Sequence, residues 1–375
     1  MKIIPNKPSH LPRLAIFAAG LLACGHALAA TDPAAPPTNI IARLIAIDNV
    51  CAWPNLTMLR DGTIIATIFG QPSHGQMEGS PECWASSDGR FWEKRGVPAP
   101  HEPSCNRMNV AAGLAGNGDL LVLCSGWTDL KQPQRPKQPA FRDDILRNWV
   151  CRSSDGGRTW AQIKDFPAPE PGWTEYIPFG DILVGDDGAL HTSCYAGEFV
   201  DPTKSTKTKT YRAWHFRSDD DGKTWRPTSV IGMKHNETSL FHLGGKRWLA
   251  AARIDAVELF RSDDDGQTWQ GPQRATARNE INAHLARLKD GRLLLSYGNR
   301  IRGQFGVLAK WSSDEGNTWS EPIRLADTLA SDCGYPSSVQ RPDGAIVTAY
   351  YASGVAQHMR YHMGVAIWHP PAPTR

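Results

Sequence analysis

The sequence predicts an all-β protein, a six-bladed β-propeller, on the strength of two patterns that run along the chain. The first is a repeated S-x-D-x-G-x-T-W motif, found at Ser153–Trp160, Ser218–Trp225, Ser262–Trp269 and Ser312–Trp319. The second is a series of apolar, β-rich runs separated by short turns. Long helical periodicity is absent, which disfavours a parallel sheet covered by helices.

The N-terminal residues have the pattern of an export signal. Basic residues precede the apolar run Leu14–Cys24, and the small residues Ala27–Ala30 follow it as a cleavage site. That run is shorter than the roughly 20 residues that span a bilayer. Leu21–Cys24 also resembles a bacterial lipoprotein box, which would leave Cys24 lipidated. We therefore expect a periplasmic or extracellular protein with a signal peptide over residues 1–30, a linker over 31–38 and one propeller domain over 39–375.

Composition narrows the classes of partner. The chain has 375 residues, 41% of them hydrophobic, and its 41 Lys and Arg residues against 38 Asp and Glu give a net charge of +3. This balance offers no support for a nucleic-acid surface. The cysteines beyond the signal are odd in number and lack CxxC or zinc-type spacing, so we expect buried small apolar residues and no metal or cofactor, with one or two disulfide bridges left open. The oligomeric state is not indicated.

Two-residue turns divide the chain into blades. Pairs such as Asp61-Gly62, Asn117-Gly118 and Asp290-Gly291 precede apolar strands, as in β-hairpins. A strand near Ile40 to Ile47 is expected to pair with the last blade and close the ring, which protects the sheet edges. The predicted blades are residues 50–100, 103–165, 173–232, 233–275, 278–325 and 330–372.

The repeated motif is interpreted as a structural turn. Its Asp accepts backbone N–H bonds, its Gly takes a positive φ, and its Trp packs the turn against the sheet. A shorter fifth copy, Ser86–Trp92, has Phe in place of Thr. We therefore do not expect these Asp residues to be catalytic.

The repeated S-x-D-x-G-x-T-W turns are of the kind called Asp boxes. A six-bladed propeller with Asp-box turns resembles the proteins of the sialidase superfamily, and the resemblance covers the whole chain beyond the signal. The fourth blade of exo-sialidases has a Glu at the start of one strand and an Arg at the end of the next, a pattern that Glu237 and Arg253 match. The fifth blade supplies another Arg, for which Arg300 is the first choice and Arg302 the alternative. The sixth blade places the catalytic tyrosine at Tyr335.

The chemistry explains this set of residue types. A sialic acid has a carboxylate on its anomeric carbon, which would repel an Asp or Glu nucleophile, whereas a neutral phenol avoids the repulsion. Sialidases are accordingly the glycosidases with a Tyr nucleophile. Glu237 would take the proton of Tyr335. Arg253 and Arg300 would bind the substrate carboxylate, whose two oxygens match a guanidinium.

Two features depart from the family pattern. Ala52, in Ala52-Trp53-Pro54, stands where the first arginine of the family's triad belongs, and Arg107 is the candidate to replace it. The acid/base Asp is also missing. The loop where it is expected offers His74 and Glu78, with Glu82 less well placed.

We therefore expect an exo-glycosidase of sialidase type that removes a terminal acidic sugar with retention of configuration. Tyr335 would be the nucleophile, Glu237 its base, and Glu78 or His74 the acid/base. One alternative is a hydrolase or lyase that acts on another acidic glycan, such as one containing uronate. The other is a non-catalytic propeller that binds a glycan or a protein, in which Tyr335 and Glu237 would lie beyond hydrogen-bond reach.

Overall fold

The computed structural model describes residues 39–128, 144–201 and 204–372, and within these ranges every regular element is a strand. The described residues all belong to one compact unit. The expected signal peptide, linker and lipidated Cys24 lie outside the described residues. No apolar helix of membrane-spanning length occurs in the described part of the chain.

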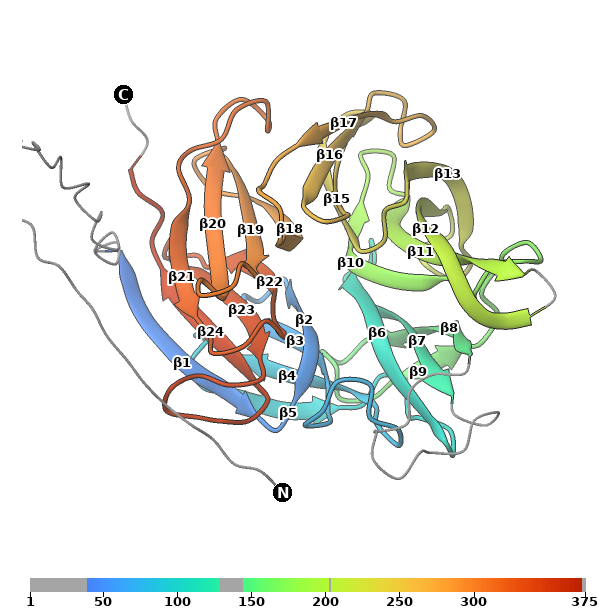
Figure 1. Ribbon diagram of the computed structural model, residues 1–375, viewed down its shortest axis with the longest axis horizontal. Helices are drawn as coiled ribbons and strands as arrows, with labels where there is room; N and C mark the ends of the chain where they lie inside the picture. Colours follow the sequence, from blue (N-terminus) through green and yellow to red (C-terminus); the bar gives the residue numbers. More distant parts are fainter. Residues whose placement is uncertain (1–38, 129–143, 202–203, 373–375) are drawn as a thin grey trace, which may run out of the picture. The chain divides into compact units, whose positions relative to one another are not determined.

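The strands form six four-stranded groups, which we call blades 1 to 6 (Figure 1). Blades 1 and 2 comprise β2 (Cys51–Met58), β3 (Ile64–Phe69), β4 (Pro81–Ser86), β5 (Glu93–Gly96), β6 (Cys105–Leu114), β7 (Leu120–Thr128), β8 (Ile145–Ser153) and β9 (Ala161–Ile163). Blades 3 and 4 comprise β10 (Ile177–Val184), β11 (Leu190–Asp201), β12 (Lys204–Ser218), β13 (Arg226–Met233), β14 (Thr238–Gly244), β15 (Arg247–Arg253), β16 (Val257–Ser262) and β17 (Gln270–Arg274). Blades 5 and 6 comprise β18 (Glu280–Arg287), β19 (Leu293–Asn299), β20 (Gly306–Ser312), β21 (Ile323–Asp327), β22 (Cys333–Gln340), β23 (Ile346–Ala352), β24 (His362–Trp368) and β1 (Ile40–Asp48).

The first strand of each blade in the order above lies innermost and contacts the first strands of the two neighbouring blades, which closes a ring (Figure 1). Pairing within each blade is antiparallel, whereas β6 and β10 pair in parallel and join blades 2 and 3 into one eight-stranded sheet. The N-terminal strand β1 pairs with β24 and completes blade 6. The predicted all-β propeller fold is confirmed.

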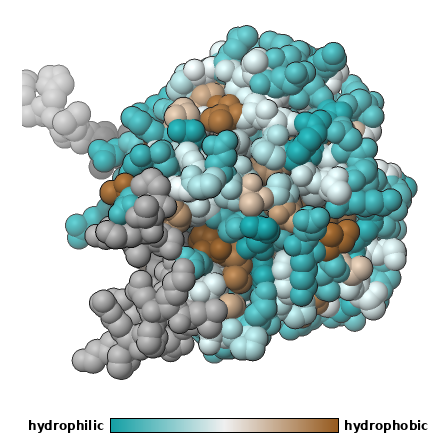
Figure 2. All heavy atoms as spheres, turned by 90° about the vertical axis from the view of Figure 1, so that its right-hand side faces the viewer, coloured by the Kyte–Doolittle hydropathy of each residue, from teal (hydrophilic) through white to brown (hydrophobic). Residues whose placement is uncertain are grey.

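Apolar side chains fill the space between the blades. Every residue of β7, β19, β23 and β24 is buried, because each of these strands has a neighbouring blade on both of its faces. Ile64 of blade 1 and Val347 of blade 6 belong to one such interior cluster. The outer surface that faces the viewer in Figure 2 is mainly hydrophilic, with separate hydrophobic patches.

The repeated turns are held by their own polar groups. In blade 2, Asp155 accepts hydrogen bonds from the Thr159 hydroxyl at 2.6 Å, the Thr159 N–H at 3.0 Å and the Ser153 hydroxyl at 2.7 Å. These bonds lower the pKa of the Asp155 carboxyl well below its usual value. The indole N–H of Trp160 donates to Gly157 O and ties the turn to the sheet. The seven cysteines from Cys51 to Cys333 are buried.

Candidate active site

Three inner strands are irregular near their N-terminal ends. Trp53 in β2, Asn282 in β18 and Tyr335 in β22 have φ angles of 55°, 61° and 50°, a region that few residues other than glycine adopt. Each lies within a register shift of its strand pair, where a bulge leaves the residue outside the regular ladder. Bulges redirect side chains, and strained backbone of this kind gathers at functional sites.

Tyr335 and Glu237 form the centre of the candidate site. The Tyr335 hydroxyl donates to Glu237 Oε1 at 2.8 Å, and Arg253 Nη1 donates to the Tyr335 oxygen at 2.9 Å. Arg253 also pairs with Glu237 Oε2, which accepts a further bond from Asn282 Nδ2 at 2.8 Å. Tyr335 is 4% exposed and Glu237 5% exposed. The cluster joins blades 4, 5 and 6, and its phenol lies within reach of a carboxylate base.

Arg300 flanks Tyr335 on another side. Its guanidinium carbon lies 5.4 Å from the centre of the Tyr335 ring, and its Nη2 donates to Cys333 O and to the Tyr351 hydroxyl. The side chains of Arg253 and Arg300 keep exposed fractions of 23% and 20%. Two guanidinium groups are therefore open to an anionic ligand beside the phenol.

Burial and charge set the protonation of these groups. Desolvation is the largest effect on Tyr335 and raises the pKa of its phenol, and Glu237 adds to this, whereas Arg253 and Arg300 lower it. Burial works against the charge of Arg253, but the Glu237 carboxylate outweighs it and raises the pKa of the guanidinium. Tyr335 is therefore a neutral hydrogen-bond donor at neutral pH and needs a base to ionise.

His74 lies against an aromatic wall beside Tyr335. Its ring stacks on Trp127 at a centroid distance of 6.3 Å and meets Trp53 edge-on at 5.3 Å. Trp53 in turn lies 5.4 Å from the Tyr335 ring. His74 Nδ1 is 3.5 Å from Asp332 Oδ1, and both side chains are about one third exposed. The His74–Asp332 pair is therefore partly open to solvent, and Trp53 contacts both His74 and the Tyr335 ring.

Asp332 also binds two tyrosines. The hydroxyls of Tyr351 and Tyr361 donate to its two carboxylate oxygens. Burial opposes ionisation of Asp332, but the hydrogen bonds from His74, Tyr351 and Tyr361 outweigh it and hold the pKa of this carboxyl well below its usual value. Asp332 is therefore a fixed negative charge beside His74.

Glu78 and Glu82 lie apart from this cluster. Glu78 Oε1 accepts the Ser104 N–H at 2.6 Å, its Oε2 lies 3.1 Å from His101 Nε2, and its side chain is 58% exposed. Glu82 is bound to Lys94 and to the Trp84 indole. Of the acidic and histidine candidates in this loop, the structure brings only His74 towards Tyr335.

Arg107 and Arg302 are also placed elsewhere. Arg107 is paired with Glu102, packs on the Trp149 ring at 4.2 Å, and is only 3% exposed at its side chain. These contacts occupy its guanidinium away from Tyr335. Arg302 is exposed in the turn after β19. Ala52 is 1% exposed and has a φ of 52°, so the position of the missing arginine is a buried part of the β2 bulge.

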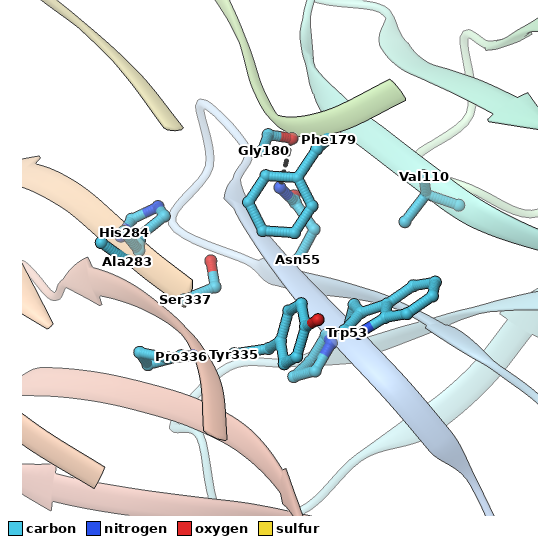
Figure 3. A pocket seen from close by; sticks show the side chains of 11 residues that line it. Trp53, Asn55, Val110, Phe179, Gly180, Ala283, His284, Tyr335, Pro336 and Ser337 are labelled. Carbon is cyan, nitrogen blue, oxygen red and sulfur yellow. Dashed lines mark hydrogen bonds between the residues drawn. The ribbon is translucent and has the colours of Figure 1, made fainter. Parts of the chain in front are cut away.

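A narrow cavity lies beneath Tyr335 on the inner side of the ring. Figure 3 shows the Tyr335 and Trp53 rings close together, with Phe179 and His284 further along the cavity wall. Asn55 Nδ2 donates to Gly180 O at 2.8 Å within this wall. The lining comes from the inner strands of five blades, so the cavity is central.

Sequence reasoning brought Glu237, Arg253, Arg300 and Tyr335 into one hypothesis, and the structure places these four together. It did not single out Asp332 or Asn282. The signal for Asp332 was its position directly before β22, which carries Tyr335. The sequence held only one indication for Asn282, its residue type, because Asn adopts a positive φ more readily than most residues.

Known proteins give independent comparisons. Residues 62–348 match the family described as BNR repeat-like domain. Over 218 residues the chain is 24% identical to a sialidase of Micromonospora viridifaciens, an alignment that covers 54% of this chain and 32% of that protein. The chain thus spans about a third of the length of this curated relative.

Solved structures share the fold. A protein of unknown function from Dyadobacter fermentans superposes with a TM-score of 0.73 at 22% identity, covering 88% of this chain and 98% of the other. A Trypanosoma rangeli sialidase in complex with sialic acid gives 0.64 at 14% identity, covering 85% and 54%. A sialidase mutant from Streptococcus pneumoniae gives 0.66 at 13% identity, covering 87% and 70%. The resemblance to the sialidase superfamily is confirmed, and because the family match extends over more than half of the chain, this protein belongs to the BNR repeat-like domain family.

Proposed function

We propose that this protein is an exo-glycosidase of sialidase type that removes a terminal acidic sugar with retention of configuration. The observation that carries the proposal is the single cluster of a phenol, a carboxylate in hydrogen-bond contact with it, and two guanidinium groups. The same contact argues against the non-catalytic alternative, which predicted that Tyr335 and Glu237 lie beyond hydrogen-bond reach.

In this proposal Arg253 and Arg300 bind the carboxylate of the sugar, and Tyr335 attacks the anomeric carbon. Glu237 accepts the phenolic proton as the bond from the Tyr335 oxygen to carbon forms. The bond to the leaving oxygen breaks at the same time. Two inversions at the anomeric carbon, the second by water, leave the configuration retained.

His74 is the proposed acid/base, in preference to Glu78. Protonated His74 gives its proton to the leaving oxygen, and the neutral ring then takes a proton from the attacking water. Asp332 orients the ring, because its Oδ1 lies 3.5 Å from Nδ1. Water attack releases Tyr335, whose oxygen recovers the proton from Glu237.

A fluorogenic sialoside tests the proposal directly. Tyr335→Phe should lower kcat by several orders of magnitude, since loss of a nucleophile removes the covalent route. The matched control is Tyr350→Phe, which removes a buried hydroxyl in blade 6 outside the cluster. Full activity in Tyr335→Phe would remove this residue from the mechanism.

A second candidate is cleavage of a uronate-containing glycan, by hydrolysis or by β-elimination. It is favoured by Ala52, which leaves two rather than three arginines at the site, and by the His74–Asp332 pair. Elimination creates an unsaturated product that absorbs in the near ultraviolet, whereas hydrolysis creates a reducing end alone. Turnover of a polyuronate oligosaccharide without turnover of the sialoside would favour this second function.

A further inference from the structure

A second group of ionisable side chains lies at the opposite end of the inner strands from Tyr335. Asp187 belongs to the turn between β10 and β11, His191 is the second residue of β11, and Asp265 belongs to the Asp-box turn of blade 4. We propose that these three side chains bind one divalent transition-metal ion, which links blade 3 to blade 4. Their candidate ligand atoms all lie within 4.8 Å of one another.

The strongest indication is the buried imidazole of His191. The residue is 0% exposed and packs on the Trp248 ring at a centroid distance of 4.3 Å. Its Nε2 has no hydrogen-bond partner among the described residues. The carboxylate oxygen Asp265 Oδ1 is 3.9 Å away, beyond hydrogen-bond distance. A buried polar atom without a partner is costly, so a ligand is expected to satisfy it.

The neighbouring hydrogen bonds indicate that His191 Nε2 carries a lone pair and no proton. His215 Nδ1 faces Gly266 O at 3.2 Å and the Thr228 oxygen at 2.7 Å, and the Thr228 hydroxyl already donates to His215 O. His215 Nδ1 therefore carries the proton, and His215 Nε2 accepts from His191 Nδ1 at 2.9 Å. His191 Nε2 is then the unprotonated nitrogen, the form in which imidazole binds metals.

Gly185 leaves room beside the proposed ligands. A Cβ at this position would lie 3.0 Å from both Asp187 Oδ1 and His191 Nε2, so the two atoms border the same small space. Bonds of about 2.0–2.2 Å to nitrogen and carboxylate oxygen would require only small side-chain movements from the present separations.

Surrounding groups orient the ligands. Trp248 Nε1 donates to Asp265 Oδ1 at 3.0 Å, and the Ala189 N–H donates to Asp187 Oδ1 at 3.0 Å. His215 fixes the ring of His191 through Nδ1. Contacts of this kind, in which a second group holds each ligand, are typical of metal sites.

The charge balance leaves room for a cation. Arg217 binds the Oδ2 atoms of Asp187 and Asp265, and it also pairs with Asp219. Asp219 has Arg226 as a further partner. One guanidinium is thus shared among three carboxylates, so Asp187 and Asp265 retain negative charge towards His191. One imidazole and two carboxylates suit Zn²⁺ or Mn²⁺ better than Ca²⁺, which prefers oxygen ligands alone.

Metal binding by the chain, stripped with a chelator and dialysed, tests the proposal. Titration calorimetry with Zn²⁺ alone should show one site, and Zn²⁺ should raise the melting temperature, because an ion that binds only the folded state stabilises it. Ca²⁺ should do neither at the same concentration. The site lies far along the inner strands from Tyr335, so hydrolytic activity is not needed as a readout.

Three variants locate the site. Asp187→Asn removes a ligand whose side chain is 46% exposed, and Gly185→Ala fills the adjoining space. Each should weaken Zn²⁺ binding by about tenfold or more, the loss typical of damage to a metal site. Asp219→Asn is the matched control, since it removes another carboxylate from Arg217 and leaves the ligands intact.

Retained affinity in Asp219→Asn together with loss in the other two variants would support the site. The proposal is overturned if the wild-type chain binds no stoichiometric Zn²⁺, if Asp187→Asn binds it as tightly as the wild type, or if all three variants lose affinity equally. Binding of Ca²⁺ in preference to Zn²⁺ would refute the ligand set.

Discussion

At the scale of single residues, the candidate site depends on side chains that the backbone holds in strained positions. Tyr335 adopts a φ of 50° and is nearly fully buried, so its hydroxyl has a fixed direction. Such strain costs of order 1–3 kcal/mol and persists only where the surrounding structure compensates for it. The Glu237 and Arg253 contacts are part of that compensation.

Asn282→Gly should lower kcat by about tenfold or more and also lower the free energy of unfolding. The variant removes the amide that donates to Glu237 Oε2, a hydrogen bond to a charged group worth about 1.5–3 kcal/mol. Glycine accepts the positive φ of this position, so the backbone is not strained further. Steady-state kinetics on the hydrolysed substrate measure the effect. Unchanged kcat would mean that Asn282 does not position Glu237.

Asp332→Asn should destabilise the protein at neutral pH, and the difference should shrink in acid. The folded-state pKa of Asp332 lies below its ordinary value of 3.8. The stabilisation is therefore present above that value and is lost as the pH falls through the lower folded-state pKa. Urea unfolding of both proteins at pH 7, 5 and 3 measures the trend, with exposed Asp327→Asn as a control. A constant difference across this range would contradict the assignment.

Residue identity and order along the chain were enough to predict that Glu237, Arg253, Arg300 and Tyr335 belong to one site. Two arginines suit the carboxylate of an acidic sugar, and a tyrosine with a base suits attack on its anomeric carbon. Arg107 shows the limit of such reasoning. Its position at the start of blade 2 suited a third arginine, but Glu102 lies five residues before it and pairs with it locally. A local ion pair of this kind depends on side-chain direction, which the sequence does not reveal.

At the scale of elements, turns were easier to predict than bulges. The Asp-box and two-residue turns carry their own signals in Asp and Gly, so the strands between them could be placed. The closing strand expected near Ile40 to Ile47 corresponds to β1 at Ile40–Asp48, paired with β24. The bulges at Trp53 and Tyr335 depend on pairing with a neighbouring strand and have no local composition signal.

Asp264→Asn in the Asp-box turn of blade 4 should lower the free energy of unfolding by about 1 kcal/mol, because it weakens hydrogen bonds to a charged acceptor. Asp264 accepts from the Thr268 hydroxyl, from the Thr268 N–H at 2.8 Å and from the Ser262 hydroxyl at 2.8 Å, and these bonds lower the pKa of its carboxyl to about 2. Urea unfolding at pH 7 measures the loss. The neighbouring Asp263→Asn, on the exposed side of the turn, should have a smaller effect; equal losses would argue against the turn as the cause.

At the scale of the whole molecule, a polar cluster connects blades that are not neighbours. Asp181 of β10 lies 2.9 Å from Asn55 Nδ2 of β2 and 2.9 Å from His284 Nε2 of β18. The three side chains thus join blades 1, 3 and 5 across the centre of the ring. Removal of one buried partner leaves the others unsatisfied.

Asp181→Asn should therefore lower the free energy of unfolding by about 1–3 kcal/mol, the usual cost of a buried polar group that loses its partner. Urea unfolding followed by tryptophan fluorescence measures this change. Asp186→Asn is a matched control, because Asp186 lies in the turn after β10 and its side chain is 65% exposed. A loss no greater than that of the control would show that the central cluster does not stabilise the ring.

The pairing of β1 with β24 has a consequence for how the protein is made. β1 is synthesised well before its partner β24, because the other blades lie between them in the sequence, so β1 must wait with an open edge while those blades assemble. Joining segments so distant in sequence is slow, because the loop entropy is lost before the contacts form. Ring closure is therefore a late step of folding, and the chain is most exposed to aggregation until it occurs.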